Sequence, residues 1–457
     1  MIIIVIKKEG ISMIRDLTQG KPEQVLRQFT LPLFISVIFQ QFYNMADTAI
    51  VGRFAAHGED AVAAIGASHP ITMIFMAIAI GSNIGCSVVI SQLFGGKQFA
   101  RMKTAITTTL TACVGLSLIL SALGLIFSSL LLRLVDTPEN IFADAGVYLN
   151  IYIGGFIFLF LYNVCNGMFT SLGDSRTPLY FLIGSSIGNI VLDWLFVAVL
   201  HLDVAGVAWA TFIAQGSAAI LAFIALLRRL HAIECEPHPF FSLPLLGQIS
   251  RIALPSILQQ SFISVGNICV QRLINGYGSA VIAGFSSAAK LNTFAITLFS
   301  TLSNGVSGFT AQNLGANRSD RVKRGFRGGL YMAAVLVGAS TLLYVLFAPA
   351  CVNLFLDGGK SPDAIATGVA FLRTAAPFYF LPAAKLVADG VLRGGGAMKQ
   401  FMTSTFLDLI LRVLLGYLFA SRWGVNGIWF SWPVGWAAAF IISMVAYARG
   451  TWQKKTA

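Results

Sequence analysis

Long apolar runs follow one another along the chain, separated by short polar segments. An α-helix rises about 1.5 Å per residue, so a run of roughly 20 residues crosses about 30 Å of hydrocarbon. The runs therefore predict an all-α membrane protein with twelve spans. These spans are expected at residues 29–52, 62–90, 104–132, 145–170, 178–200, 204–227, 252–276, 280–310, 328–356, 365–391, 401–420 and 427–448.

A more polar stretch at residues 228–250, which contains three prolines, divides the twelve spans into two sets of six. The chain is accordingly predicted to fold as two six-helix bundles. The expected parts are an N-terminal cytoplasmic segment at 1–28, an N-lobe at 29–227, a cytoplasmic linker at 228–250, a C-lobe at 251–448 and a cytoplasmic tail at 449–457.

The two predicted lobes share a pattern of residues in the same order. Residues 28–32 (QFTLP) and 251–255 (RIALP) each open a lobe and end in Leu-Pro. Six spans return the chain to the side on which it began, so the lobes are predicted to be parallel repeats related by a pseudo-two-fold axis along the membrane normal. Further matches with identical spacing are Gly85, Gln92 and Gly95 in one lobe and Gly305, Gln312 and Gly315 in the other.

Composition agrees with this picture, because 56% of the 457 residues are hydrophobic and only 11% are charged, against about 25% charged in soluble domains. The net charge of +12 could indicate nucleic-acid binding. Most basic residues, however, fall in segments that share one side of the membrane if both termini are cytoplasmic, as the positive-inside rule requires. No nucleic-acid partner is therefore expected. The loops of the opposite side keep only Arg53, Arg133, Lys360 and Arg422.

The first predicted span is polar along one face. Gln40, Asn44 and Asp47 are spaced i, i+4 and i+7, and Thr48 lies beside them. On a helix these side chains share one side. A carboxylate in a membrane span is costly and usually marks an ion or substrate path. The alternative is a carboxylate kept neutral in a helix contact.

Five short segments of the chain stand out as motifs. They are 45–54 (MADTAIVGRF), 92–96 (QLFGG), 173–178 (GDSRTP), 312–316 (QNLGA) and 392–396 (LRGGG). In these segments and their order the chain resembles the multidrug and toxic compound extrusion (MATE) transporters. The resemblance implies the MATE/MOP fold and cation-coupled antiport, in which organic, often cationic or amphipathic compounds leave by alternating access while H⁺ or Na⁺ enters.

Within that family the chain is similar to the DinF-like branch. The NorM-like branch also uses acids in the seventh and tenth spans, but the seventh span here offers only Gln259 and Gln260. The resemblance therefore places ion coupling in the N-lobe, where either a proton or Na⁺ could bind. Two carboxylates in one pocket cannot both ionise cheaply, which favours a proton. The predicted coupling residues are Asp47, Asn163, Asn166, Asn189 and Asp193, with Na⁺ as the alternative at Asp47, Asn189 and Asp193.

Other residues receive weaker predictions. Pro32 is a possible hinge, because proline removes a backbone hydrogen bond, or it only starts the helix. Two i, i+4 pairs in the C-lobe, Lys385 with Asp389 and Asp408 with Arg412, are predicted to be internal ion pairs. Candidates for the substrate path are Gln40, Asn44, Thr48, Gln259, Gln260 and Lys290.

The predicted protein is a monomer of the inner membrane, with both termini cytoplasmic, that contacts lipid and small-molecule drugs or organic cations. No metal and no cofactor apart from the coupling ion is expected, because the six cysteines and five histidines form no ligand pattern. An enzyme is disfavoured for lack of clustered histidines or paired acids at a membrane face. The rival function is a flippase for lipid-linked oligosaccharides or lipids. Met1 and Met13 are alternative start residues.

Overall fold

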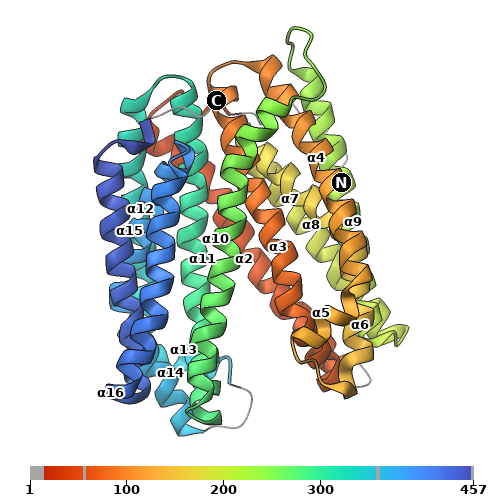
Figure 1. Ribbon diagram of the computed structural model, residues 1–457, viewed down its shortest axis with the longest axis vertical. Helices are drawn as coiled ribbons and strands as arrows, with labels where there is room; N and C mark the ends of the chain where they lie inside the picture. The colour runs from red at the N-terminus through yellow and green to blue at the C-terminus, as the bar shows by residue number, and fades with distance from the viewer. Residues whose placement is uncertain (1–14, 55–57, 357–360, 454–457) are drawn as a thin grey trace. The chain divides into compact units, whose positions relative to one another are not determined.

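The computed structural model describes residues 15–54, 58–356 and 361–453, apart from the side chains of residues 47–49, 51–53 and 58–60. The described chain is almost entirely helical and contains no strand (Figure 1). The alternative start residues Met1 and Met13 lie outside the described residues. The first half forms α2 (Pro22–Phe54), α3 (Gly58–Gly95), α4 (Phe99–Ile126), α5 (Ser128–Leu134), α6 (Glu139–Gly154), α7 (Phe156–Ser171), α8 (Arg176–Asp193), the π-helical η1 (Trp194–Val199) and α9 (Asp203–Ala232).

The second half repeats this order of long and short helices. It forms α10 (Leu243–Asn275), α11 (Ser279–Gly315), α12 (Ser319–Leu346), α13 (Ala348–Asn353), α14 (Pro362–Ala375), the 3₁₀ turn η2 (Ala376–Phe378), α15 (Phe380–Gly394), α16 (Met398–Ala448) and the 3₁₀ turn η3 (Thr451–Gln453).

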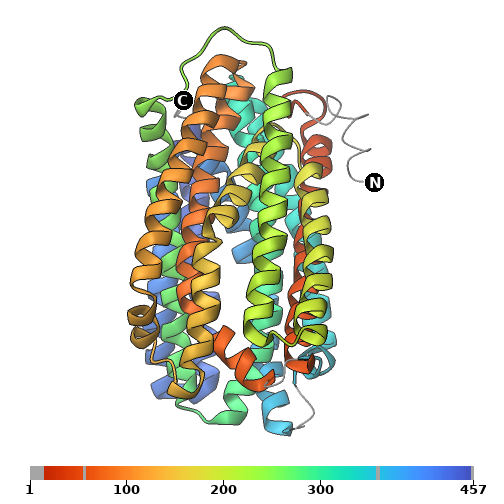
Figure 2. The same cartoon turned by 90° about the vertical axis from the view of Figure 1, so that its right-hand side faces the viewer.

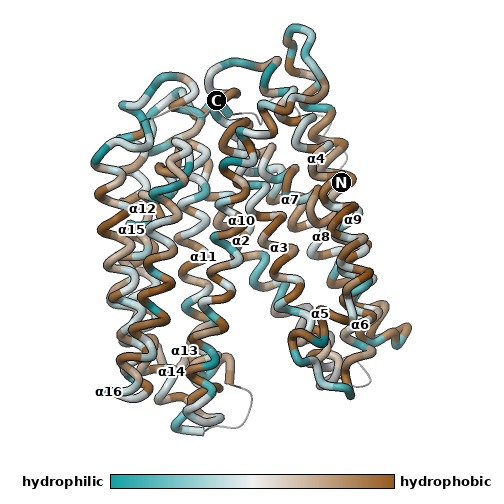
Figure 3. Tube along the Cα trace, viewed as in Figure 1, coloured by the Kyte–Doolittle hydropathy of each residue, from teal (hydrophilic) through white to brown (hydrophobic). Residues whose placement is uncertain are grey.

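The helices account for the predicted spans. Among the described residues, nine helices are long and apolar enough to cross a membrane, and the bent pairs α6–α7 (48°) and α14–α15 (52°) add two more. The 51 residues of α16 would measure about 77 Å as one straight helix, but Gly424 interrupts them with φ 60°. Residues on either side of Gly424 therefore supply two spans, in agreement with the predicted twelve-helix fold. Hydrophobic residues predominate along the helices, and hydrophilic ones gather at the turns (Figure 3).

The described chain divides into two compact units, and each takes one segment from the other half of the sequence. Unit 1 consists of residues 15–16 and 31–258, and unit 2 of residues 17–30 and 259–453. Helix α2 therefore begins in unit 2 and continues in unit 1, whereas α10 begins in unit 1 and continues in unit 2. The predicted lobe boundaries, at residues 29 and 251, did not include this exchange of helix starts.

In unit 1, α7 packs against α3, α4 and α9. Helices α4 and α9, orange and yellow-green in Figure 2, run along the vertical direction of that view. The start of α10 lies against glycines of α3. A Cβ atom at Gly85 would come within 2.6 Å of Ala253 Cβ, and one at Gly81 within 2.4 Å of Ile257 Cγ1. Only glycine allows the two helices to approach so closely.

In unit 2, α11 packs against α12, α14 and α15, and the start of α2 takes the place that α10 has in unit 1. A Cβ atom at Gly305 would lie 2.8 Å from Thr30 Oγ1. Gly305 is the repeat partner of Gly85, and Thr30 is the repeat partner of Ala253. The two units therefore build the same helix contact from matched residues, which confirms that the predicted repeat is structural.

The residues that precede α2 are also fixed to unit 2. The Leu17 amide donates to Gln312 Oε1 (3.0 Å), and Asn313 Nδ2 donates to the Leu17 carbonyl (3.2 Å). Arg321 donates to the carbonyls of Leu17, Gln19 and Gly20 at 3.2, 3.1 and 2.6 Å. These bonds satisfy backbone groups that have no partner within a helix.

Candidate ion-coupling site

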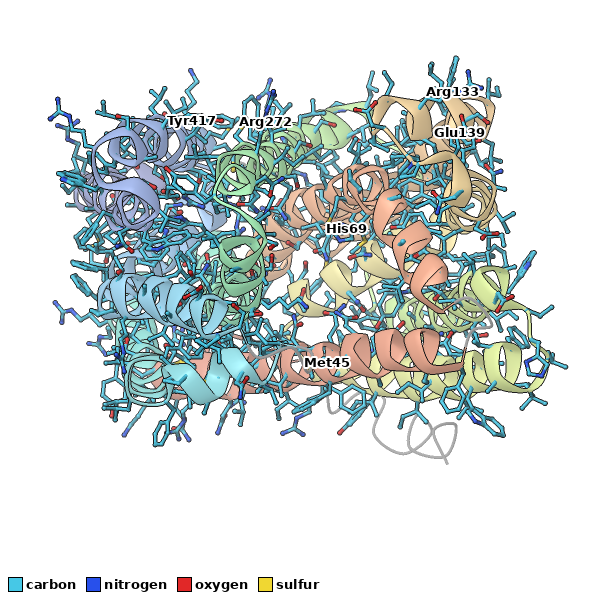
Figure 4. The ribbon with its side chains drawn as sticks, turned by 90° about the horizontal axis from the view of Figure 1, so that it is seen from below. Met45, His69, Arg133, Glu139, Arg272 and Tyr417 are labelled. Atoms are coloured by element: carbon cyan, nitrogen blue, oxygen red, sulfur yellow. The ribbon has the colours of Figure 1, made fainter. Side chains whose placement is uncertain are left out.

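Helix α2 contributes the polar face that the sequence predicts for the first span. Its backbone carries Asp47 and Thr48, but the side chains of these two residues lie outside the described part of the structure. One turn earlier, Gln40 and Asn44 are exposed. Figure 4, which shows the molecule from below, labels Met45 on α2, which follows Asn44 and is 50% exposed, and His69 on α3.

One hydrogen bond joins this face of α2 to α8. The Tyr43 hydroxyl donates to Asn189 Oδ1, and Asn189 is buried. Asn189 Nδ2 is also buried and makes no hydrogen bond within the described residues. Burying an amide N–H group without a partner costs free energy. The site therefore favours a further group whose oxygen accepts a hydrogen bond from Asn189 Nδ2. Tyr43 was not predicted, although its place next to Asn44 could have indicated it.

Asp193 is the last residue of α8, and its side chain is fully buried at 0% exposure. Directly after it the chain changes to the π-helical turn η1. Such turns are rare and are often found at functional sites. A buried carboxylate one turn after Asn189, on the same helix, is consistent with the prediction that the pair faces one site.

Asn163 and Asn166 lie on α7. Asn163 Nδ2 donates to the Leu159 carbonyl of its own helix at 2.9 Å, which is a local structural bond. Asn166 Oδ1 and the Tyr162 hydroxyl one turn before it are both buried, and the two side chains interact with each other. The described contacts bring Tyr43 and Asn189 together, and the participation of Asn163 and Asn166 stays a prediction.

The turn between α7 and α8 is held by a buried ion pair. Asp174, 1% exposed, accepts the amide N–H groups of Arg176 and Thr177, both at 3.0 Å, and forms an ion pair with Arg229 of α9. Arg229 also donates to Thr177 Oγ1 at 2.9 Å and lies 5.3 Å from the Phe169 ring centre. This network fixes the relative positions of α7, α8 and α9, and so of the asparagines that two of them carry.

The substrate-path candidates in unit 2 have different surroundings. Gln259 is buried, Gln260 is half-buried, and Lys290 is exposed. Lys290 Nζ lies 5.7 Å from the Phe355 ring centre and makes no ion pair within the described residues.

Both predicted ion pairs of unit 2 are confirmed. Lys385 Nζ lies 2.7 Å from Asp389 Oδ2, and Arg412 Nη2 lies 2.7 Å from Asp408 Oδ2. All four side chains are buried. In the part of the chain that the structure describes, no three His, Cys, Asp or Glu side chains gather as a metal site would require.

The fold and the paired units define the class of protein as a multi-span helical membrane protein built from an internal repeat. The model of the MatE family matches the chain twice, at residues 32–195 and 255–418. The chain therefore belongs to the MATE family of multidrug efflux transporters, for which ion coupling is the known mechanism.

Individual relatives agree with this assignment. The chain is 28% identical over 449 residues to the probable multidrug resistance protein YpnP of Bacillus subtilis, covering 96% of this chain and 97% of that protein. It is 27% identical over 343 residues to an FAD transporter of Shewanella oneidensis, covering 73% and 74%. A solved MOP superfamily transporter from Pyrococcus furiosus shares the fold with a TM-score of 0.88 and 22% identity, over 96% of this chain and 97% of that one.

Proposed function

We propose that this protein is an inner-membrane antiporter that exports amphipathic organic compounds in exchange for H⁺ or Na⁺. The observation that carries the proposal is the fully buried carboxylate of Asp193. It lies one turn after Asn189, and Asn189 accepts a hydrogen bond from Tyr43 of α2. Membership of the MATE family supplies the class of reaction. The basic segments support cytoplasmic termini through the positive-inside rule.

The coupling ion would act at the polar residues of unit 1. Protonating Asp193 and Asp47 would remove charge from the site, and Na⁺ would instead need the carboxylates and amide oxygens as ligands. In either case the bound ion changes the free energy of the arrangement in which Tyr43 contacts Asn189. Ion binding can thereby bias one conformation over another, which coupling requires.

Pro32 lies at a place where α2 could bend when the coupling ion binds. It lies two residues after the point at which α2 passes from unit 2 to unit 1, and it has no N–H to donate to the helix. A helix that lacks one backbone bond bends more easily at that place. We therefore keep Pro32 as the hinge of the proposed mechanism.

The test is efflux of ethidium from vesicles that are energised separately by a proton gradient and by a sodium gradient. The gradient that drives efflux identifies the ion. Asp47→Asn and Asp193→Asn should each reduce coupled efflux to the rate of protein-free vesicles, because an amide neither exchanges a proton nor supplies charge. The matched control is Asp363→Asn, which changes an exposed acid in the first turn of α14 and should leave efflux unchanged.

Two outcomes would contradict the proposal. If both Asn variants export ethidium at the unaltered protein's rate, these carboxylates do not couple transport. If the unaltered protein moves a lipid-linked oligosaccharide across the bilayer but no dye under either gradient, the chain is a flippase and not a drug antiporter.

A further inference from the structure

Helix α11 of unit 2 carries an uninterrupted line of polar side chains along one face. Their spacing of 4, 3, 4, 3 and 4 residues places them in one line on a helix. Each of them is exposed or half-buried, whereas the other faces of α11 pack against α12, α14 and α15. This line, called the α11 ridge below, consists of Ser286, Lys290, Thr293, Thr297, Ser300 and Asn304.

The fold does not require a polar ridge at this place. Counting from the matched glycines Gly85 and Gly305, the positions of α3 equivalent to the last four ridge residues are all apolar, and α3 contains no lysine or arginine. The equivalent residues are Met73, Ala77, Ile80 and Ile84. At these four positions unit 1 builds the corresponding helix from apolar residues, so the α11 ridge is not needed for packing.

The ridge is suited to water and a solute, not to lipid. A lysine within a span that faces hydrocarbon costs several kcal/mol. The side chains of Ser286, Lys290, Thr293 and Ser300 make no hydrogen bond or ion pair within the described residues, so their polar groups are available to a ligand. Four available polar groups on one exposed face indicate a surface that a dissolved molecule contacts.

The charges of unit 2 determine the sign of that molecule. The buried acids Asp389 and Asp408 are each paired within 2.7 Å to a base of their own helix. Lys290 is left without an acid, and at the other end of the ridge Arg393 donates to Asn304 Oδ1 at 2.7 Å. Both ends of the ridge thus carry a base, and neither of these two buried acids is left unpaired to attract a cation.

Arg272 is the basic residue that α10 contributes to unit 2. It lies in the last turn of that helix and is exposed (Figure 4). Asn304 lies 14 residues after Lys290, which corresponds to about 21 Å along the helix axis, so this part of the ridge has the length of an extended organic molecule.

We propose that the α11 ridge binds the anionic end of an elongated amphipathic substrate. A carboxylate, sulfonate or phosphate of the substrate binds Lys290, and other polar groups of the substrate bind the serine and threonine hydroxyls of the ridge. The proposal rests on the export function stated above and adds amphipathic organic anions to the substrates of that function. The Phe355 ring beside the ammonium group limits the positions that Lys290 can take, which favours one bound geometry over many.

The experiment compares two probes that differ only in charge: a xanthene dye with a free carboxylate and the ethyl ester of the same dye. Binding to the purified full-length protein is measured by fluorescence anisotropy, and export is measured in energised vesicles. The unaltered protein should bind the carboxylate form more tightly. Lys290→Gln should weaken its binding about tenfold, as loss of a charge-assisted bond predicts, and change binding of the ester by less than about twofold.

Two variants serve as controls. Lys290→Arg keeps the charge and should stay within about threefold of the unaltered protein. Lys399→Gln removes an exposed lysine at the start of α16 in the same unit and should have no effect on either probe. Equal effects of Lys290→Gln on both probes, or tighter binding of the ester by the unaltered protein, would overturn the inference.

The two proposals fail in different ways. If the carboxylate form binds through Lys290 but no gradient drives its export, ion-coupled transport fails and the ridge remains a binding site for anions. If the ester is exported under an ion gradient while the carboxylate form neither binds nor moves, the transport function stands and the inference about the ridge is wrong.

Discussion

The turns that end α7 in unit 1 and α15 in unit 2 have the same backbone. Asp174 N donates to the Phe169 carbonyl at 3.0 Å, and Ala397 N donates to the Leu392 carbonyl at 2.8 Å. Gly173 and Gly396 occupy the same left-handed position, with φ 78° and 74°. Counting back from these glycines identifies which residues of the two helices are equivalent.

The equivalent positions carry different chemistry. Tyr162 and Asn166 of unit 1 correspond to Lys385 and Asp389 of unit 2. Both are pairs one turn apart, but unit 2 has an ion pair where unit 1 has two neutral side chains that interact with each other. Unit 2 therefore buries two charges that neutralise each other, whereas unit 1 buries no charge at the equivalent positions.

The largest effect is expected from breaking the pair in unit 2. Asp389→Asn leaves Lys385 buried without a counter-charge, and it weakens the hydrogen bonds that Ser404 and Ser443 donate to Asp389 Oδ1. Removing one partner of a buried pair costs about 3–5 kcal/mol, which can be measured as unfolding free energy in a denaturing-detergent titration.

The matched control removes both partners. Lys385→Met combined with Asp389→Leu deletes both charges and should be close to neutral, because two compensating charges disappear together. If the double variant is as unstable as Asp389→Asn, the cost does not arise from the unpaired lysine, and the contrast between the units loses its electrostatic basis.

A smaller effect is expected where the units pack alike. Gly85→Ala would place a Cβ 2.8 Å from the backbone N of Ala253, whereas Gly305→Ala would meet Thr30 Oγ1, a side-chain atom that can turn away. Overpacking costs about 1–3 kcal/mol, so both variants should be destabilised and Gly85→Ala the more so, by the same titration. Gly115→Ala on α4, with nothing within 4 Å, should show no loss. If Gly305→Ala lost more stability than Gly85→Ala, the result would contradict the rigid contact between Gly85 and the backbone of Ala253.

The smallest effect concerns the link between α2 and α8. Tyr43→Phe removes the donor to Asn189 Oδ1, and the loss should be about 1 kcal/mol, as for an ordinary hydrogen bond. Tyr331→Phe on α12, where the side chain is 74% exposed, is the control that should not change stability. A Tyr43→Phe variant as stable as this control would show that the bond does not hold the two helices together.

Much of the fold could be predicted because its evidence is local. Apolar runs mark spans, and an acid four residues from a base on one helix, such as Lys385 with Asp389, predicts an ion pair. The exchange of helix starts between the units could not be predicted, because the two repeats have equivalent residues at the exchanged positions. Thr30 and Ala253 occupy equivalent positions, so a contact of either with Gly85 or with Gly305 satisfies the same pattern.

The candidate site was predicted less completely. Asn189 and Asp193 were predicted because their spacing is helical, and their role stays a prediction. Tyr43, which donates to Asn189, was not predicted because an aromatic residue in an apolar span resembles a packing residue. The α11 ridge was represented by Lys290 alone. Serine and threonine are close to neutral in hydropathy, so a line of them hardly lowers the average of the span that contains it.

The exchanged helix starts have a consequence for biosynthesis. Gln312, which accepts the amide hydrogen of Leu17, is made 295 residues after Leu17. At roughly 5–20 residues per second the nascent chain waits about 15–60 s before that partner exists. The α3 glycines of unit 1 likewise stay uncovered until the ribosome has completed the start of α10. Neither unit can finish folding from its own half of the sequence, so the two halves must complete their folding together.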